Sequence, residues 1–170
     1  MDLSSFLRDV PDFPKPGIVF KDISPLLADP RALRASIEGL AEKMAAARVE
    51  RVVGIESRGF IFGAALAYKL KAGVIPIRKK GKLPYKTISA TYQLEYGTDT
   101  LEMHEDAVRK GTRVLIVDDL LATGGTAKAT AELLKRGGAK IVGLAFLIEL
   151  TFLKGRENLK REDVFSLIKY

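Results

Sequence analysis

Short apolar runs alternate along this chain with longer segments in which apolar residues recur at helical spacing. Four runs are predicted to be strands of a sheet core: Arg51 to Ile55, Val74 to Ile77, Arg113 to Asp118 and Lys140 to Leu150. The third contains four consecutive apolar residues, three of them β-branched, which is typical of a strand buried on both faces. A last short strand is expected from Asp163 to Ile168.

Helical periodicity occupies the segments between these strands. One helix is expected after Asp29, a good N-cap, with Pro30 at its first position. Its apolar residues recur at helical spacing: Leu33, Ile37, Leu40, Ala41 and Met44. A second helix is expected over residues 59–70, and a third runs through Arg136 to Gly137-Gly138, a pair that ends helices. Strands that alternate with helices indicate an α/β fold with a mostly parallel central sheet flanked by helices.

Two further segments follow other patterns. Residues 3–10 are predicted to form a short helix, after which the prolines and Gly17 interrupt regular structure, and residues 18–20 are expected to be extended. Residues 87–95 and 98–104 alternate weakly on either side of Gly97, which favours an antiparallel ribbon. No internal repeat occurs, and we expect a single domain over residues 1–170.

Composition and charge narrow the class of protein. One hundred and seventy residues with 47% hydrophobic content suit one soluble globular domain. Because the chain has no cysteine, neither a disulfide framework nor a thiolate metal site can form. The first residues lack the order of a secretory signal, and no run approaches the roughly 18 to 20 apolar residues of a membrane span. A cytoplasmic location without a membrane partner is expected.

The formal net charge of +7 calls for an acidic partner, either nucleic acid or a small polyphosphate. The densest basic group is Arg78, Lys79, Lys80 and Lys82, in a loop that also contains glycine and proline. A charge run of this kind is usually solvated surface. Together with the motifs described next, a phosphorylated small molecule explains it better than nucleic acid does.

The strongest chemical signal is Asp118-Asp119 followed by residues 122–126, Ala-Thr-Gly-Gly-Thr. In an open α/β fold the carboxyl edge of the sheet binds ligands. Adjacent carboxylates can accept the hydroxyls of a vicinal diol such as ribose, and amides at a helix N-terminus suit a phosphate. Taken alone, the acids could be a solvated pair and the glycines a tight turn. The spacing is neither a Walker loop nor a dinucleotide fingerprint.

This segment resembles the phosphoribosyl-pyrophosphate (PRPP) signature of the type I phosphoribosyltransferases. Three further blocks make the chain similar to the adenine-specific members of that family. They are residues 12–27 (DFPKPGIVFKDISPLL), residues 54–60 (GIESRGF), and residues 78–84 (RKKGKLP) with 94–97 (LEYG). The resemblance implies the type I phosphoribosyltransferase fold, with a small N-terminal hood from about residues 1–30 and a flexible catalytic loop from about residues 79–96.

The resemblance assigns roles around PRPP. Asp118 and Asp119 would hold the ribose hydroxyls, with Asp118 also favouring a cationic transition state. The 5-phosphate would bind to Ala122, Thr123, Gly124, Gly125 and Thr126. Pyrophosphate would bind to Glu56, Ser57, Arg58, Arg78 and Lys82, with Arg58 counted as catalytic and a cis peptide bond at Glu56-Ser57. As patterns alone, residues 56–59 could be an ordinary helix start capped by Ser57.

It also assigns the base site. Val19, Phe20 and Lys21 would bind adenine, with Phe20 stacking on the ring and main-chain groups reading its edge, although these residues could simply pack a loop. Glu95 would be the catalytic acid or base at the imidazole edge, and Tyr96 a gate. Without the resemblance, a Glu-Tyr pair before a glycine turn is usually structural. His104, the only histidine, is interpreted as a surface residue.

The resemblance thus implies transfer of the phosphoribosyl group from PRPP to adenine, giving AMP and pyrophosphate. A Mg²⁺ would be bound with PRPP rather than directly by the protein, and a homodimer is expected, without a nucleic-acid partner. Two alternatives stay open. One is transfer to another base, such as hypoxanthine, guanine, xanthine, orotate or uracil. The other is a PRPP-sensing regulator that does not catalyse, which usually carries a separate DNA-binding region.

Overall fold

A computed structural model describes residues 1–93 and 97–170, and the chain forms two compact units, Met1–Gly39 and Leu40–Tyr170. The first unit is built around a two-stranded antiparallel sheet, β1 and β2, in which Val10 pairs with Phe20. Its elements in chain order are a 3-10 helix η1 (Leu3–Phe6), β1 (Arg8–Pro11), β2 (Val19–Asp22), α1 (Ser24–Ala28) and the first turns of α2 (Pro30–Met44).

The prediction of a helix over residues 3–10 is wrong beyond its first turn. Asp2 caps a single 3-10 turn by accepting the N–H of Ser4 (2.9 Å), and the chain then becomes strand β1. Pairing with β2 across the proline-rich connection outweighs a weak local helical pattern, because short helices have little stability of their own. Helix α1 was not predicted; Pro25 lies in its first turn, and Asp22 accepts the N–H of Ser24 (2.9 Å).

The second unit is a seven-stranded sheet in the order β5-β6-β4-β3-β7-β8-β9. Strands β4, β3, β7, β8 and β9 pair in parallel, whereas β5 and β6 form an antiparallel ribbon that joins the edge of β4. The strands are β3 (Arg51–Ile55), β4 (Gly73–Lys79), β5 (Thr87–Gln93), β6 (Thr98–His104), β7 (Arg113–Leu121), β8 (Lys140–Glu149) and β9 (Val164–Lys169). The predicted, mostly parallel α/β sheet is confirmed.

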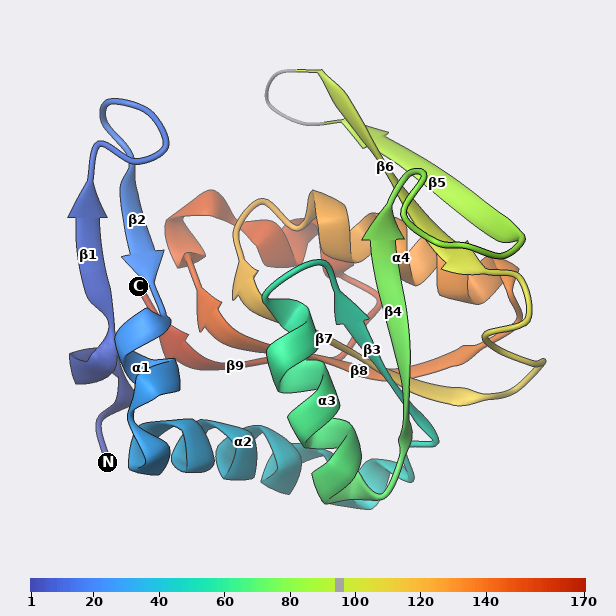
Figure 1. Cartoon of the computed structure of the whole chain (residues 1–170), viewed down its shortest axis with the longest axis horizontal. Coiled ribbons are helices and arrows are strands. Elements are labelled where there is room, and N and C mark those ends of the chain that lie inside the picture. The colour runs from blue at the N-terminus through green and yellow to red at the C-terminus, as the bar shows by residue number, and fades with distance from the viewer. Residues whose placement is uncertain (94–96) are drawn as a thin grey trace. The chain divides into compact units, whose positions relative to one another are not determined.

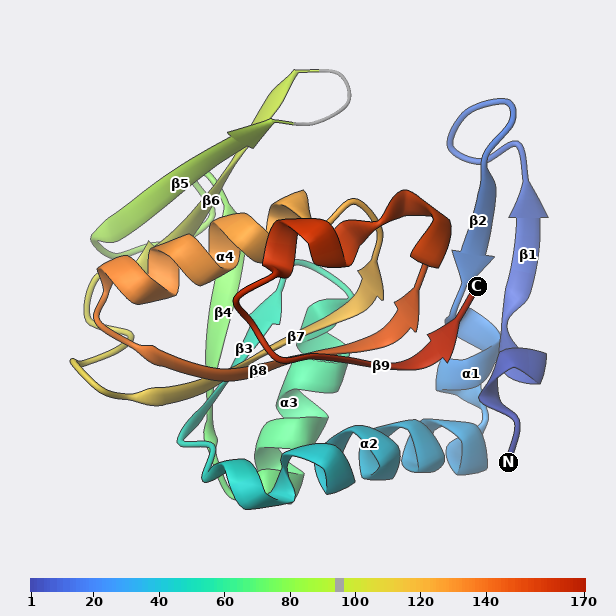
Figure 2. The same cartoon turned by 180° about the vertical axis from the view of Figure 1, so that it is seen from behind.

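Two helices cover opposite faces of this sheet, α3 (Gly59–Leu70) on one side and α4 (Gly125–Arg136) on the other (Figures 1 and 2). Short 3-10 helices complete the unit: η2 (Ala45–Ala47), η3 (Thr151–Leu153) and η4 (Gly155–Leu159). The predicted helix boundaries agree closely with α3 and with the end of α4. The predicted cap of α2 is also confirmed, since Asp29 accepts the N–H groups of Arg31 (2.8 Å) and Ala32 (2.9 Å).

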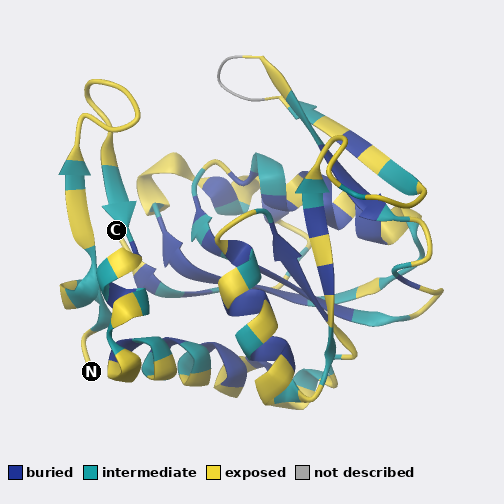
Figure 3. Cartoon of the chain, in the orientation of Figure 1, coloured by how far each residue is buried: buried dark blue, intermediate teal, exposed yellow. Residues whose placement is uncertain are grey.

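The core lies along the central strands. Val114 to Val117 of β7 and Leu144 to Ile148 of β8 are almost completely buried, and they form the dark centre of the sheet in Figure 3. Burial on both faces is what the continuous apolar runs predicted. Among the described residues, no helix is both long enough and apolar enough to cross a membrane.

Candidate active site

The candidate site lies at the end of β7, where the strand is paired with β8 but no longer with β3. Pairing with β3 ends at Gly54 and Val117, whereas pairing with β8 continues to Leu121 and Glu149. The sequence placed the strand end at Asp118, but β7 runs on to Leu121, because β8 still offers hydrogen-bond partners. Asp118 and Asp119 therefore lie inside β7, beyond the point where its pairing with β3 ends.

The turn that follows β3 lies beside this unpaired part of β7. Gly59, the first residue of α3, lies so close that a Cβ there would be 2.8 Å from Asp118 Oδ1 and 3.0 Å from the carbonyl oxygen of Val117. Arg58 Nε forms an ion pair with Asp119 Oδ2. The peptide bond between Glu56 and Ser57 is cis, as the resemblance implied. The turn after β3 and the two aspartates of β7, both singled out in the sequence, thus meet at the carboxyl edge of the sheet.

The two aspartates are held in different ways. Asp119 is 5% exposed and its charge is balanced by Arg58. Asp118 accepts the N–H of Asp119 (2.9 Å) through Oδ1. Burial, followed by the adjacent Asp119 carboxylate, raises the pKa of Asp118 well above its ordinary value. The pair is therefore not a solvated acidic edge; it is a partly desolvated diacid with one cationic partner.

The predicted phosphate-binding residues, Ala122 to Thr126, comprise the connection between β7 and α4 and the first two residues of that helix; this stretch is here named the phosphate turn. Gly124 has a positive φ of 82° and precedes the first residue of α4, a conformation that favours glycine. A cavity of about 80 Å³ is lined by the phosphate turn and by Asp118, Leu120, Leu121, Ala127 and Phe146. Pockets for whole small ligands are roughly 300–1,000 Å³, so this cavity suits a single phosphate group.

The predicted pyrophosphate residues are tied together by Glu56. Its carboxylate forms ion pairs with Lys82 Nζ and Arg78 Nε, and it accepts the backbone N–H of Lys79 (2.9 Å). Burial alone would raise the pKa of Glu56, but the hydrogen bonds from Lys82, Lys79 and Arg78 together lower it. Arg78, near the end of β4, and Lys82, in the loop that follows, are therefore joined to the turn after β3, and both converge on Glu56.

The remaining predicted residues lie elsewhere. Val19, Phe20 and Lys21 belong to β2 in the first unit, where the Phe20 ring meets Phe13 edge-on at 5.2 Å. Lys21 Nζ pairs with Asp9 (2.7 Å), which leaves its main-chain groups as the expected base contacts. Glu95 and Tyr96 lie outside the described residues. His104 pairs with Thr87, at the far end of the ribbon from the connection that contains Gly97; it is half-buried rather than on the surface.

Sequence reasoning missed residues that contact the phosphate turn from outside. Thr126 donates a hydrogen bond to the hydroxyl of Tyr92 on β5 (3.3 Å). Asn158 of η4 donates through Nδ2 to the carbonyl oxygen of Thr123 (2.8 Å). Each partner is more than thirty residues away in sequence, so no local spacing could have indicated it.

Comparison with known proteins identifies the family. The protein-family model described as "phosphoribosyl transferase domain" matches residues 26–168 of the chain. The chain belongs to the phosphoribosyltransferase family. Proteins of this family that resemble it over nearly the whole length are named adenine phosphoribosyltransferase. That of Syntrophotalea carbinolica is 59% identical, with 99% of each chain covered.

Solved structures of phosphoribosyltransferases agree. The adenine phosphoribosyltransferase of Thermoanaerobacter pseudethanolicus has a TM-score of 0.97 and 52% identity, covering 99% of this chain and 98% of that one. The enzyme of Saccharomyces cerevisiae, solved with adenine and an imino-altritol bisphosphate, has a TM-score of 0.90 and 41% identity, with 97% and 96% covered. The resemblance to the adenine-specific members, inferred from four sequence blocks, is thereby confirmed.

Proposed function

We propose that this phosphoribosyltransferase transfers the 5-phosphoribosyl group of PRPP to adenine, giving AMP and pyrophosphate in a purine salvage step. The observation that carries the proposal is the meeting of a diacid and a phosphate-sized cavity at one edge of the sheet. A ribose 5-phosphate satisfies both parts at once. Full-length relatives named adenine phosphoribosyltransferase support adenine as the acceptor over the alternative bases.

The reaction is a substitution at the anomeric carbon of the ribose. The bond from this carbon to pyrophosphate breaks, a bond to N9 of adenine forms, and the N9 proton leaves. Positive charge develops on the sugar ring between these events, and the carboxylates of Asp118 and Asp119 favour it electrostatically. Asp119 already carries one cationic partner, Arg58; when the ribose hydroxyls engage the diacid, the guanidinium can pair with the departing pyrophosphate.

The basic loop supplies the rest of the pyrophosphate contacts. Arg78 and Lys82 both pair with Glu56 in this structure. When pyrophosphate binds, these two cations would pair with its several phosphate oxygens in place of the single Glu56 carboxylate. We propose that residues 79–96 close over the site and exclude water, because an activated ribosyl centre would otherwise be hydrolysed. Glu95 is proposed to take the N9 proton or to hold N7–H, with Tyr96 as a gate.

Magnesium is the metal that this family implies. Within residues 1–93 and 97–170, no three histidine, cysteine or carboxylate side chains gather to hold a metal ion. Mg²⁺ commonly keeps several waters and takes its other ligands from substrate phosphates, and we propose that it enters the site with PRPP. When bound, it would neutralise charge on the leaving pyrophosphate. The protein's share is the arrangement of Asp118, Asp119 and the basic loop around the substrate.

The base site, quaternary structure and location are further proposals. Val19, Phe20 and Lys21 are proposed to bind adenine from the N-terminal hood. A homodimer is supported by exposed apolar residues on α3, Ile61 (43% exposed) and Tyr68 (90%). A cytoplasmic location, without nucleic-acid or membrane partners, remains a prediction.

A spectrophotometric assay tests the proposal. Purified protein, PRPP and Mg²⁺ are combined in turn with adenine, hypoxanthine, guanine, xanthine, orotate and uracil. Turnover with adenine at a kcat/KM at least about a hundredfold above the other bases is expected, because a site built to hydrogen-bond the amino group rejects bases that lack it. Preference for another base would overturn the assignment. PRPP binding without turnover of any base would indicate a regulator.

A further inference from the structure

The 3-10 helix η4 lies directly behind the phosphate turn. Asn158 Nδ2 donates to the carbonyl oxygen of Thr123 (2.8 Å). A Cβ on Gly124 would overlap with the carbonyl oxygen of Gly155, and a Cβ on Gly155 would overlap with that of Ala122. Two stretches of backbone about thirty residues apart in sequence are therefore in van der Waals contact, and one side-chain hydrogen bond joins them.

This hydrogen bond fixes the direction of an amide. The carbonyl of Thr123 and the N–H of Gly124 belong to the same trans peptide unit, so they point in opposite directions. Asn158 holds the carbonyl toward η4, and the N–H is consequently directed to the other side of the turn. The cavity of about 80 Å³ is lined by both residues. A carbonyl that rotated into this cavity would repel a phosphate, whereas the amide attracts it.

Asn158 is mounted on a firm support. Arg156, two residues before Asn158, donates from Nε and Nη2 to the two carboxylate oxygens of Glu149 (2.6 and 2.8 Å). Its Nη1 donates to the carbonyl oxygen of Val164 (2.7 Å). Glu149 is 4% exposed and accepts a further hydrogen bond from Ser166. This network fixes η4 to the ends of β8 and β9, so the Asn158 amide has a defined position relative to the sheet.

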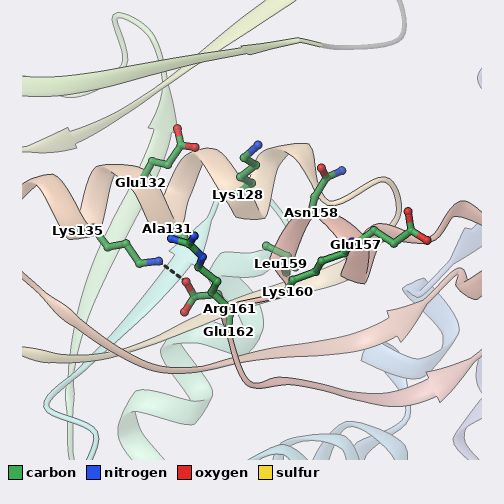
Figure 4. A pocket seen from close by; sticks show the side chains of 10 residues that line it. All are labelled: Lys128, Ala131, Glu132, Lys135, Glu157, Asn158, Leu159, Lys160, Arg161 and Glu162. Atoms are coloured by element: carbon green, nitrogen blue, oxygen red, sulfur yellow. Dashed lines mark hydrogen bonds and ion pairs between the residues drawn. The ribbon is translucent and has the colours of Figure 1, made fainter.

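A second link, farther from the phosphate turn, joins α4 to the residues that follow η4. Lys135 of α4 pairs with Glu162, beyond the end of η4. Figure 4 shows both regions: Asn158 lies near the start of α4, and the Lys135–Glu162 pair lies toward its other end, across a surface depression that Arg161 also lines. Variants at this second link change the packing of η4 against α4 without touching the phosphate turn. They therefore serve as matched controls.

We propose that Asn158 is a positioning residue for phosphate recognition, acting through the Thr123–Gly124 peptide unit. It touches no substrate; it keeps the amides of the phosphate turn directed at the 5-phosphate of PRPP and AMP. The inference rests on the proposed function, since it assumes that the cavity holds that phosphate. Loss of the Asn158 donor therefore weakens ligands that carry the 5-phosphate and leaves pyrophosphate, which is assigned to residues 56–58, Arg78 and Lys82, unaffected.

The test is calorimetric titration of AMP, ribose 5-phosphate and pyrophosphate into wild type, Asn158→Ala and the control Lys135→Ala, which breaks the second link. In Asn158→Ala the dissociation constants of AMP and ribose 5-phosphate are expected to rise about three- to tenfold, the worth of one intramolecular hydrogen bond, with pyrophosphate unchanged. In steady state the KM for PRPP rises and the KM for adenine does not. Lys135→Ala should match wild type throughout.

Asn158→Asp provides a second variant of equal size that cannot donate to the carbonyl. It is expected to weaken AMP at least as much as Asn158→Ala does. Unchanged AMP affinity in both variants overturns the inference, and so does an equal loss of AMP and pyrophosphate accompanied by a lower Tm, which indicates a structural role. A wild-type protein that binds neither AMP nor ribose 5-phosphate overturns the proposed function instead.

Discussion

Adjacent residues of the same type behave differently at this site. Asp119 is paired with Arg58, and its charge is compensated before any substrate arrives. For Asp118, burial and the neighbouring negative charge of Asp119 both disfavour the ionised form, and its pKa is raised as a result. Arg58 lowers the pKa of Asp118 less than burial and Asp119 raise it. A desolvated carboxyl at this position is therefore better explained by chemistry on the substrate than by stability.

Asp118→Asn should therefore reduce turnover much more than it disturbs folding. Asparagine resembles the protonated acid in size, but it supplies no negative charge to the sugar ring. We expect kcat to fall about 10²–10³-fold, as when one preorganised electrostatic group is removed, with a Tm no lower than that of the wild type. Steady-state kinetics and thermal unfolding of the same preparation measure both. A parallel loss of Tm and kcat would indicate a structural role.

The raised pKa also predicts the sign of a pH effect on stability. The unfolded chain ionises Asp118 near its ordinary value of 3.8, and the folded protein does so only at higher pH. The contribution of this residue is fully present below about pH 4 and is lost as pH rises through the folded-state pKa. Asp118→Asn removes that loss, so its free energy of unfolding relative to the wild type should increase from pH 4 to pH 8 in denaturant titrations.

Glu95→Gln tests the acid–base assignment at the adenine. If Glu95 handles the N9 proton or holds N7–H, the amide should lower kcat by about 10²–10⁴-fold. The dissociation constant of PRPP should stay nearly constant, because none of the proposed PRPP contacts involves this residue. Rapid-quench kinetics and PRPP titrations separate the two quantities. An unchanged kcat would remove Glu95 from this role.

At the scale of elements, local rules predicted those that depend on a continuous pattern. β3, the cap of α2 and the full length of α3 follow from burial, capping and helical spacing in adjacent residues. β1 could not be predicted in the same way, because its conformation depends on pairing with β2 across a proline-rich connection. Similarly, β7 extends past Asp118 because β8 lies beside it, which a single strand's sequence does not reveal.

The residues of the site also divide into those that the local sequence predicts and those that depend on tertiary packing. The residues proposed to face the ligand, Asp118, Asp119 and the phosphate turn, lie in one uninterrupted stretch whose chemistry the sequence indicates directly. The residues that support them come from elsewhere: Tyr92 from the ribbon and Asn158 from η4. Nothing near Asn158 in the sequence indicates a partner at residue 123. Supporting contacts of this kind are set by tertiary packing, so a single sequence does not contain their signal.

Gly124→Ala tests the contact between the phosphate turn and η4 as a unit. The substitution adds a Cβ that overlaps with the carbonyl of Gly155, at a residue whose φ is +82°. Gly111→Ala is a matched control, since its φ is +85° and nothing lies within 4 Å of the added Cβ. The control should lose about 1 kcal/mol of stability from backbone strain alone.

Gly124→Ala should lose clearly more stability than the control, and it alone should raise the KM for PRPP. The reason is that relief of the overlap requires the turn or η4 to move, and movement misdirects the amides. Denaturant unfolding with steady-state kinetics on both variants measures the difference. Equal stability losses and equal KM values would show that the close approach of Gly155 has no functional part.

At the scale of the whole molecule, α3 has a surface that a monomer does not explain. The helix is apolar on almost every side, as helices buried all round are, yet Ile61, Ala64 and Tyr68 are exposed at i, i+3 and i+7. Val74, at the start of β4, is 46% exposed as well. An apolar stripe of this kind marks an interaction surface, and a second copy of the chain is the partner that the proposed homodimer provides.

Ile61→Glu should then convert a dimer into a monomer. A charge placed in the middle of an apolar self-interface meets its symmetry-related copy, and burying both without partners costs far more than a small interface supplies. Light scattering after size exclusion is expected to give the mass of two chains for the wild type and of one chain for the variant. Tyr85→Glu, at a residue 57% exposed in the basic-loop region, should remain dimeric. If Ile61→Glu also remains dimeric, the interface lies on another face, and the apolar stripe of α3 has some other partner.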